Sequence, residues 1–257
     1  MRRFPWVLTV FSALTFALLI ALGVWQVQRL QWKEGLIAEA KAAAAMPPMD
    51  PTELRRNGGP EAEFRTVRLT CAGLDAAPYV ELRTIQDGQP GVRLISPCIT
   101  ARYSMGGETH RDVYLVDRGF VSETVSARPS QAWSDRDVEI VAQVRHPPPP
   151  NGMTPSPDGR QFYGRDNRAM AEMLMTTPPP GRTAGLGSVR PATLFATTSS
   201  NPEWQALQPS APPAAFSNNH LGYAITWFGL ALALAGFYIA LLRRKLAGPD
   251  AGTKDLP

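Results

Sequence analysis

Two apolar runs without a charged residue lie near the two ends of the chain. They cover Trp6–Trp25 and Leu221–Leu242, and each has the roughly 20 residues that a helix needs to cross a bilayer. We therefore predict two transmembrane helices, at 6–25 and 220–242. For the first run a cleaved signal peptide is the alternative, because Ala21-Leu22-Gly23 fits a cleavage site.

Between these runs the hydrophobic pattern is that of short strands. Five segments are rich in β-branched and aromatic residues and are bounded by Gly, Pro or Asp: Phe64–Cys71, Tyr79–Ile85, Val92–Thr100, Val113–Phe120 and Val138–Val144. Thr193–Thr197 is a weaker candidate, and Gly88–Gly91 and Gly106-Gly107 predict turns. One helix is predicted from Asp166 to Met175, capped by Asp166 or Asn167.

With so few helices between the strands, the sheet is predicted to be antiparallel. The fold class is thus a membrane protein of the α+β type. Two transmembrane helices flank an antiparallel β-rich extracytoplasmic domain over residues 26–219, either open or closed into a small barrel.

The net charge of +4 lies at the ends of the chain. Residues 26–219 hold 20 basic and 20 acidic side chains, so no basic stripe favours nucleic acid as a partner. The excess is carried by Arg2 and Arg3 before the first run and by Arg243, Arg244 and Lys245 after the second. This predicts cytoplasmic termini, 1–5 and 243–257, and an outside domain. The ratio of 22 Arg to 4 Lys is common in GC-rich bacterial genomes, which favours a bacterial inner membrane and a periplasmic domain.

The second run has two distinct helical faces. His220, Trp227, Ala231 and Tyr238 share one face. Small residues share the other, at Gly222, Thr226, Gly229, Ala233 and Gly236. Because small residues let two helices approach closely in lipid, we predict that the small-residue face packs on the first helix and that His220 points outward.

The remaining candidate chemistry is sparse. Cys71 and Cys98 fall on different predicted strands and either form a disulfide or stay as two buried thiols. Met170, Met173 and Met175 are core residues rather than ligands of a copper(I) carrier, since they recur at helical spacing. Known catalytic motifs such as Gly-x-Ser-x-Gly, His-Glu-x-x-His and the P-loop do not occur, so an enzyme is not expected.

Three stretches resemble the Surfeit-locus-one family, the Shy-one proteins of yeast. These are Leu22–Lys33, the Val116-Asp117-Arg118-Gly119-Phe120 segment, and Asn218-Asn219-His220-Leu221-Gly222-Tyr223-Ala224-Ile225-Thr226-Trp227. The third is the most specific. The second departs from the family's usual Val-Asn-Arg-Gly-Trp at Asp117 and Phe120, which puts a role for that Asn or Trp in doubt here.

The resemblance implies an assembly factor for a haem-copper cytochrome c oxidase. It implies haem a as a transiently bound cofactor, and oxidase subunit I and haem a synthase as partners. His220 would ligate the haem iron, with Trp25, Gln26, Arg29, Tyr223 and Trp227 around it. The alternatives are a scaffold that binds no haem, with the aromatic residues serving as a membrane-interface belt, and, less favoured, a periplasmic hydrolase or copper carrier.

Overall fold

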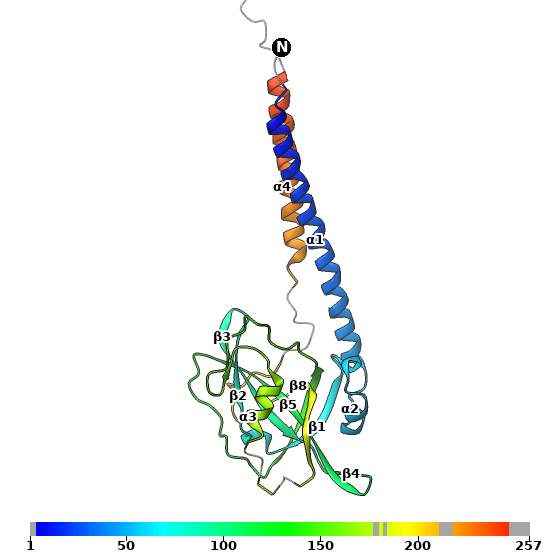
Figure 1. The fold of residues 1–257 in the computed structure, drawn as a ribbon, viewed down its shortest axis with the longest axis vertical. Coiled ribbons are helices and arrows are strands. Elements are labelled where there is room, and N and C mark those ends of the chain that lie inside the picture. Colours follow the sequence, from blue (N-terminus) through cyan, green and yellow to red (C-terminus); the bar gives the residue numbers. More distant parts are fainter. Residues whose placement is uncertain (1–3, 177–179, 182–183, 211–217, 247–257) are drawn as a thin grey trace, which may run out of the picture. The chain divides into compact units, whose positions relative to one another are not determined.

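The computed structural model describes residues 4–176, 180–181, 184–210 and 218–246 (Figure 1). The chain divides into a helical unit, Met1–Ile37 with Phe216–Pro257, and a β-rich unit, Ala38–Ala215. Arg2 and Arg3, on which the predicted orientation partly rests, lie outside the described residues, as does 247–257 of the predicted cytoplasmic tail.

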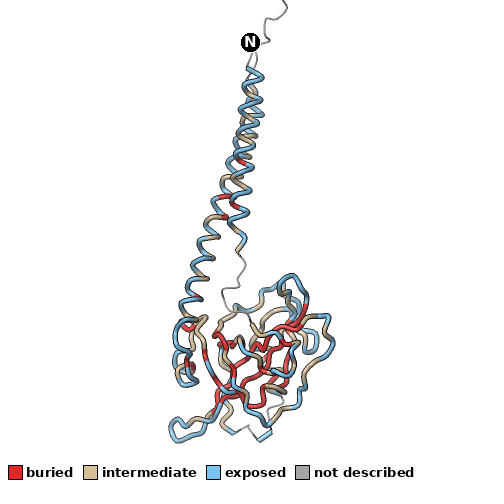
Figure 2. Tube along the Cα trace, turned by 180° about the vertical axis from the view of Figure 1, so that it is seen from behind, coloured by how far each residue is buried: buried red, intermediate tan, exposed pale blue. Residues whose placement is uncertain are grey.

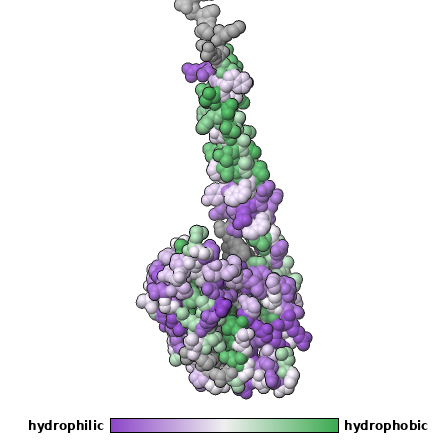
Figure 3. Space-filling model, viewed as in Figure 1, coloured by the Kyte–Doolittle hydropathy of each residue, from purple (hydrophilic) through white to green (hydrophobic). Residues whose placement is uncertain are grey.

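Two long helices dominate the helical unit. α1 runs from Trp6 to Ala45 and α4 from His220 to Leu246, and both are long and apolar enough to cross a membrane. Most residues of their apolar stretches are exposed, in contrast to the buried strands of the β-rich unit (Figure 2). Hydrophobic side chains accordingly cover the surface along the helices (Figure 3). This pattern is consistent with a membrane protein, because a core helix of a soluble domain would be covered. α1 contains the whole predicted span 6–25 and continues to Ala45.

An eight-stranded sheet forms the β-rich unit, in the order β1-β6-β8-β5-β3-β2-β7 with β4 paired to β5. The strands are β1 Thr66–Ala72, β2 Val80–Gln86, β3 Gln89–Ile99, β4 Tyr103–Met105, β5 Glu108–Ser122, β6 Asp137–Arg145, β7 Gln161–Phe162 and β8 Leu186–Ala196. Each of the five predicted strands is present, with ends shifted by a few residues. The weaker candidate is present too, but begins at Leu186 instead of Thr193.

The sheet is mixed, so the prediction of an antiparallel sheet is wrong for two of its ladders. β5 pairs with β8 in parallel, and so does β2 with β7. Parallel neighbours need a long connection, and the chain between β5 and β8 supplies one, since it passes through β6, β7 and helix α3.

A disulfide joins strands that are not neighbours in the sheet. Cys71 of β1 and Cys98 of β3 are bonded, although three strands separate β1 from β3 in the sheet order. The sheet is therefore strongly coiled, but no β1–β3 ladder closes it among the described strands. The barrel alternative is wrong, and the disulfide alternative is the one that the structure adopts.

Two apolar clusters lie on opposite faces of β5, and a third, smaller one contains Leu94, Val121 and Leu207. One contains the disulfide and residues of β1, β6 and β8, such as Leu69, Ile140 and Leu194. The other lies under α3 (Asn167–Leu174), where Met170 and Leu174 contact Leu115 and Phe162. Met170 is thus a core residue, as predicted. The predicted cap of this helix is confirmed as well, because Asp166 accepts a hydrogen bond from the Ala169 N–H.

Shorter elements complete the β-rich unit. α2 (Pro51–Asn57) is capped by Asp50, and single 3₁₀ turns lie at Pro60–Ala62 and Leu74–Ala76. The β2–β3 hairpin turns at Asp87 and Gly88, both with positive φ, so the turn comes one residue before the predicted one. The prediction at Gly106-Gly107 is confirmed as the β4–β5 turn.

Candidate functional site

Two polar pairs join α1 to α4 in the helical unit. His220 Nδ1 lies 2.7 Å from Gln26 Oε1, and Thr9 Oγ1 lies 2.7 Å from the Tyr238 hydroxyl. Residue numbers therefore rise along α1 as they fall along α4, and the two helices are antiparallel. Both pairs are partly buried between the helices, so each favours their association at its own end.

The face of α4 that packs on α1 is the one that carries His220. Ala224 and Ala231 are 2% and 1% exposed. Together with His220, Trp227 and Tyr238 they follow steps of four, three, four and seven residues, which is the spacing of a coiled-coil seam. The prediction that His220 points away from the first helix is wrong.

The predicted small-residue seam is wrong for the same reason. A Cβ added at Gly222, Gly229 or Gly236 would meet no described atom within 4 Å. The close approach lies instead on α1, where a Cβ at Gly23 would come within 2.6 Å of the Phe228 ring. Small residues permit contact on either face of α4, but it is His220 and Tyr238 on the other face that hydrogen-bond to α1.

The His220–Gln26 hydrogen bond fixes the chemistry of the imidazole. Gln26 Oε1 has no hydrogen, so His220 Nδ1 donates to it, and in the neutral imidazole the lone pair is then on Nε2. Gln26 is 9% exposed and His220 is half-buried. Histidines that ligate metals are commonly held in this way, by an acceptor on the nitrogen that does not bind the metal. The pair is thus suited to ligating a metal through Nε2.

Three more predicted residues lie on one side of this pair. At about 100° per residue, Arg29 and Trp25 project about 60° and 100° away from the direction of Gln26, both to the same side. α4 runs the opposite way, so Tyr223, three residues after His220, projects to that side as well. All three side chains are exposed.

The opposite side of the pair is filled by packing. Gly23 and Phe228 both project there, in agreement with their contact. Trp227 is half-buried and turns toward α1, so its ring belongs to the seam between the helices. The Arg29 guanidinium lies 3.9 Å from the centre of the Trp32 ring, in a cation–π contact on α1.

A second cluster of charged groups is buried in the β-rich unit around Asp117 of β5. Its carboxylate is fully buried and accepts hydrogen bonds from Arg93 Nε at 2.7 Å, Arg165 Nη2 at 2.6 Å and the Gly119 N–H at 3.2 Å. Burial raises the pKa of Asp117, but the attraction of Arg165 and Arg93 outweighs it and holds this pKa below its ordinary value. Asp117, at the position where the Val-Asn-Arg-Gly-Trp pattern has Asn, therefore neutralises two arginines.

Arg118 points to the other face of β5 and is fully buried. It donates to Ser200 Oγ at 2.8 Å and to the Asp75 carbonyl at 2.9 Å, and burial lowers its pKa to about 10. The guanidinium thus ties β5 to the turn after β1 and to the segment after β8. Both acceptors are uncharged, so the contact is a structural one.

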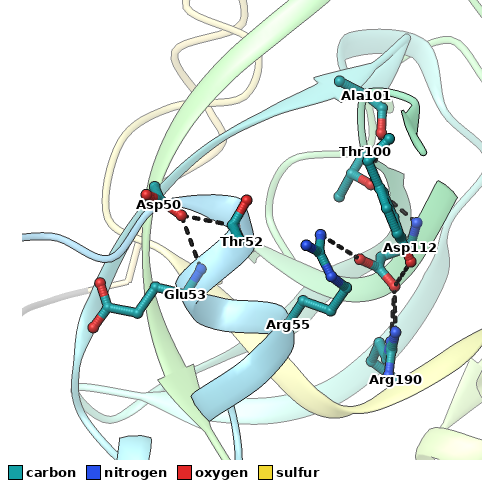
Figure 4. A network of polar contacts seen from close by, with 9 residues as sticks. Asp50, Thr52, Glu53, Arg55, Thr100, Ala101, Asp112 and Arg190 are labelled. Atoms are coloured by element: carbon teal, nitrogen blue, oxygen red, sulfur yellow. Dashed lines mark hydrogen bonds and ion pairs between the residues drawn. The ribbon is translucent and has the colours of Figure 1, made fainter. Parts of the chain in front are cut away.

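A third network joins α2, β5 and β8 through Asp112 (Figure 4). The Asp112 carboxylate accepts from Arg190 at 2.6 Å and from the Tyr103 hydroxyl at 3.2 Å, and Arg55 of α2 approaches it to 3.9 Å. Arg55 also stacks on the Tyr103 ring at 4.0 Å. Every ionised group here faces an opposite charge, as expected of a network that holds α2 on the sheet.

The model of the SURF1 family matches residues 13–232. The chain belongs to the SURF1 family. A SURF1-like protein of Rickettsia conorii is 27% identical over 91% of this chain and 90% of its own length. Surfeit locus protein 1 of Homo sapiens is 26% identical over 95% of this chain and 79% of its own length. The resemblance that we noted in the sequence is confirmed.

In this SURF1 family member the structure brings two predicted site residues into contact, Gln26 and His220. It places Trp25, Arg29 and Tyr223 on one side of them and Trp227 in the seam. No group of three or more His, Cys, Asp or Glu side chains in the described part of the chain is arranged to hold a metal ion. The Thr9–Tyr238 pair was not predicted from the sequence. The signal that could have indicated it is the position of Tyr238 on the same face of α4 as His220.

Proposed function

We propose that this protein is an assembly factor for an aa3-type cytochrome c oxidase that binds haem a at the outer end of the helix pair and aids its insertion into subunit I. Membership of the SURF1 family supports the assembly role. The observation that carries the haem proposal is the 2.7 Å hydrogen bond from His220 to Gln26, which leaves Nε2 as a free nitrogen ligand.

The residues around His220 fit a haem group. His220 would ligate the iron, and Gln26 would hold the imidazole in the required tautomer. The exposed Trp25 and Tyr223 rings offer apolar surface on the same side, and Arg29 offers a planar cation for a haem carboxylate. Trp227 would support the seam rather than touch the ligand. When bound, haem a would supply the redox-active iron that the oxidase needs.

We propose a bacterial inner membrane as the location, with both termini cytoplasmic and the β-rich unit periplasmic. Arg243, Arg244 and Lys245 at the end of α4 support a cytoplasmic C-terminus. The Cys71–Cys98 disulfide supports an oxidising compartment for the β-rich unit. Haem a synthase would deliver the haem and subunit I would receive it. Since both handle haem a as membrane proteins, the exchange would take place laterally at His220.

The absorption spectrum of the full chain tests the proposal. The protein is purified in mild detergent from cells that make haem a, and we expect a Soret band. His220→Ala should remove or strongly shift this band, because histidine ligation sets the spin state of the iron. Gln26→Leu should keep the band but weaken haem retention about 10–100-fold, as loss of a supporting partner does at metal sites. His110→Ala is the control, since His110 lies on β5 in the β-rich unit.

Two results would contradict the haem proposal. Colourless wild-type protein that co-purifies with oxidase subunit I would favour the scaffold without haem. An unchanged spectrum in His220→Ala at equal haem occupancy would exclude this ligand. For the topology, alkaline phosphatase fused after Ser130 should be active and after Pro257 inactive; the reverse pattern would place the β-rich unit in the cytoplasm.

A further inference from the structure

A groove of about 570 Å³ lies between α3 and the first half of β8. We call it the α3–β8 groove. One wall is α3 with its neighbouring residue Met175, and the other is the run Gly187–Pro191 of β8. Five consecutive residues of β8 line the groove. Successive side chains of a strand point to opposite faces of a sheet, so a groove over one face would be lined by alternate residues only. The groove therefore opens along the edge of β8 rather than over one of its faces.

That edge of β8 has no strand partner in the described part of the chain. The β6 ladder reaches β8 only from Thr193 to Ala196, ending at the pair Arg145–Thr193. The chain then enters Pro147–Pro150, which have no N–H groups to continue a ladder. Leu186–Ala192 is consequently paired on its β5 side alone. An open strand edge presents backbone donors and acceptors that another extended chain can pair with.

The lining of the groove is mostly apolar, and each of its three charged side chains has a partner of opposite charge. Arg168 and Glu172 on α3 pair with each other at 3.0 Å, and Arg190 is held by Asp112 at 2.6 Å. Since these charges already have partners, the groove favours an uncharged occupant. Ala171 and Met175 supply apolar contact from the helix wall.

Asn167, one of the residues that line the groove, carries a buried acceptor. Asn167 Nδ2 donates to Thr193 Oγ1 at 2.8 Å, at the point where the β6 ladder stops. Asn167 Oδ1 is buried and has no hydrogen-bond partner among the described residues. Buried acceptors are normally satisfied, which makes this oxygen a candidate partner for an N–H group of a bound segment once the side chains around it move.

We propose that the α3–β8 groove binds an extended, uncharged segment of another protein, which adds to the sheet as a strand beside β8. The unpaired edge suits a polypeptide backbone, and the mostly apolar walls, whose charges are already paired, favour uncharged side chains. The edge from Leu186 to Pro191 matches a segment of five or six residues, about 17–20 Å long. This site is separate from His220 and does not depend on haem binding.

Binding of a defined peptide to the full chain in detergent tests this proposal. The probe is a fluorescein-labelled peptide of alternating threonine and valine, six residues long, followed by fluorescence anisotropy. Two further peptides carry N-methyl groups on the odd or on the even residues, and each blocks one backbone edge. We expect one of these two to lose at least tenfold in affinity and the other to bind like the parent, because a single edge pairs with β8.

A pair of neighbouring variants locates the site. Met175→Glu brings an unpaired carboxylate to the groove wall and should weaken binding at least tenfold. Thr176→Glu is the control, since Thr176 is exposed and does not line the groove, and should change affinity less than twofold. Equal melting temperatures confirm that both variants fold. Failure of the parent peptide to bind, equal binding of all three peptides, or self-association of the protein through this face would each overturn the proposal.

Discussion

Replacing Asp117 by Asn tests whether the acid at this position holds the β-rich unit together. Asn has nearly the same shape, so the change removes the charge and leaves the volume. Arg93 and Arg165 would then face each other across a neutral amide, with their side chains only 14% and 12% exposed. The amide nitrogen is also a donor, and it would meet the donors of Arg93, Arg165 or Gly119.

The expected loss follows from the contacts. Two of the three hydrogen bonds to Asp117 come from charged donors, at 2.7 and 2.6 Å, and hydrogen bonds to charged groups contribute about 1.5–3 kcal/mol each. Breaking one partner of a buried ion pair costs about 3–5 kcal/mol. Asn keeps one acceptor and the arginines regain some water, so we expect a loss of about 3 kcal/mol. For a unit of this size that corresponds to about 6–12 °C in Tm.

Denaturant unfolding of the full chain in mild detergent measures this difference. Fluorescence of Trp133, which packs against the cluster with the disulfide, and of Trp204, which packs against the smaller cluster around Leu94, follows the transition. The folded pKa of Asp117 is lowered, so its stabilisation is present above the unfolded pKa and is lost as pH falls through the folded value. The difference in the free energy of unfolding between wild type and Asp117→Asn should be constant above about pH 5 and shrink below about pH 4.

The control is Glu139→Gln, which breaks the exposed pair between Arg68 and Glu139 and should leave stability unchanged. Equal stability of wild type and Asp117→Asn at pH 7 would refute the reasoning. A difference in the free energy of unfolding that persisted unchanged at pH 2 would show that Asn destabilises the unit by disturbing packing, and not by removing the charge.

Two further predictions concern the helix pair and the disulfide. Gly23→Leu should separate α1 from α4, because a Cβ there meets the Phe228 ring at 2.6 Å, whereas Gly229→Leu should be tolerated. Ala13 and Ala235 line one groove between the helices, so the rate of disulfide formation between cysteines placed there reports the distance between α1 and α4. Similar rates in both variants would contradict the observed seam. Replacing Cys71 and Cys98 by Ala should destabilise the β-rich unit by about 3.5 kcal/mol, since the bond closes a loop with a sequence separation of 27. A loss below about 1 kcal/mol in the same denaturant assay would show that the unfolded chain gains little freedom without the bond.

The sequence alone determined the elements whose signal is local. The uncharged runs predicted both long helices, because about 20 apolar residues suffice to indicate a span whatever lies around them. Alternation predicted the strands, since successive side chains point to opposite faces of any sheet. Asp166 predicted the start of α3, because a cap depends on the next three residues alone.

Which surfaces meet was decided by the tertiary structure. Periodicity defined two usable faces of α4 but could not choose between them, because the choice depends on Gln26 and Thr9, which lie about 190 and 230 residues away in sequence. The parallel β5–β8 ladder was equally hidden, since strand direction is set by where α3 returns the chain to the sheet.

The same holds for the buried charges and the open edge of β8. Asp117 in an apolar run indicates a buried acid, but its partners Arg93 and Arg165 come from separate elements that only the folded sheet brings together. β6 leaves β8 unpaired where Pro147 begins, yet this matters only because β8 lies beside β6. Local patterns fix what each segment becomes. Contacts between distant segments fix where the His220 site and the α3–β8 groove form, because they depend on which side chains can satisfy one another.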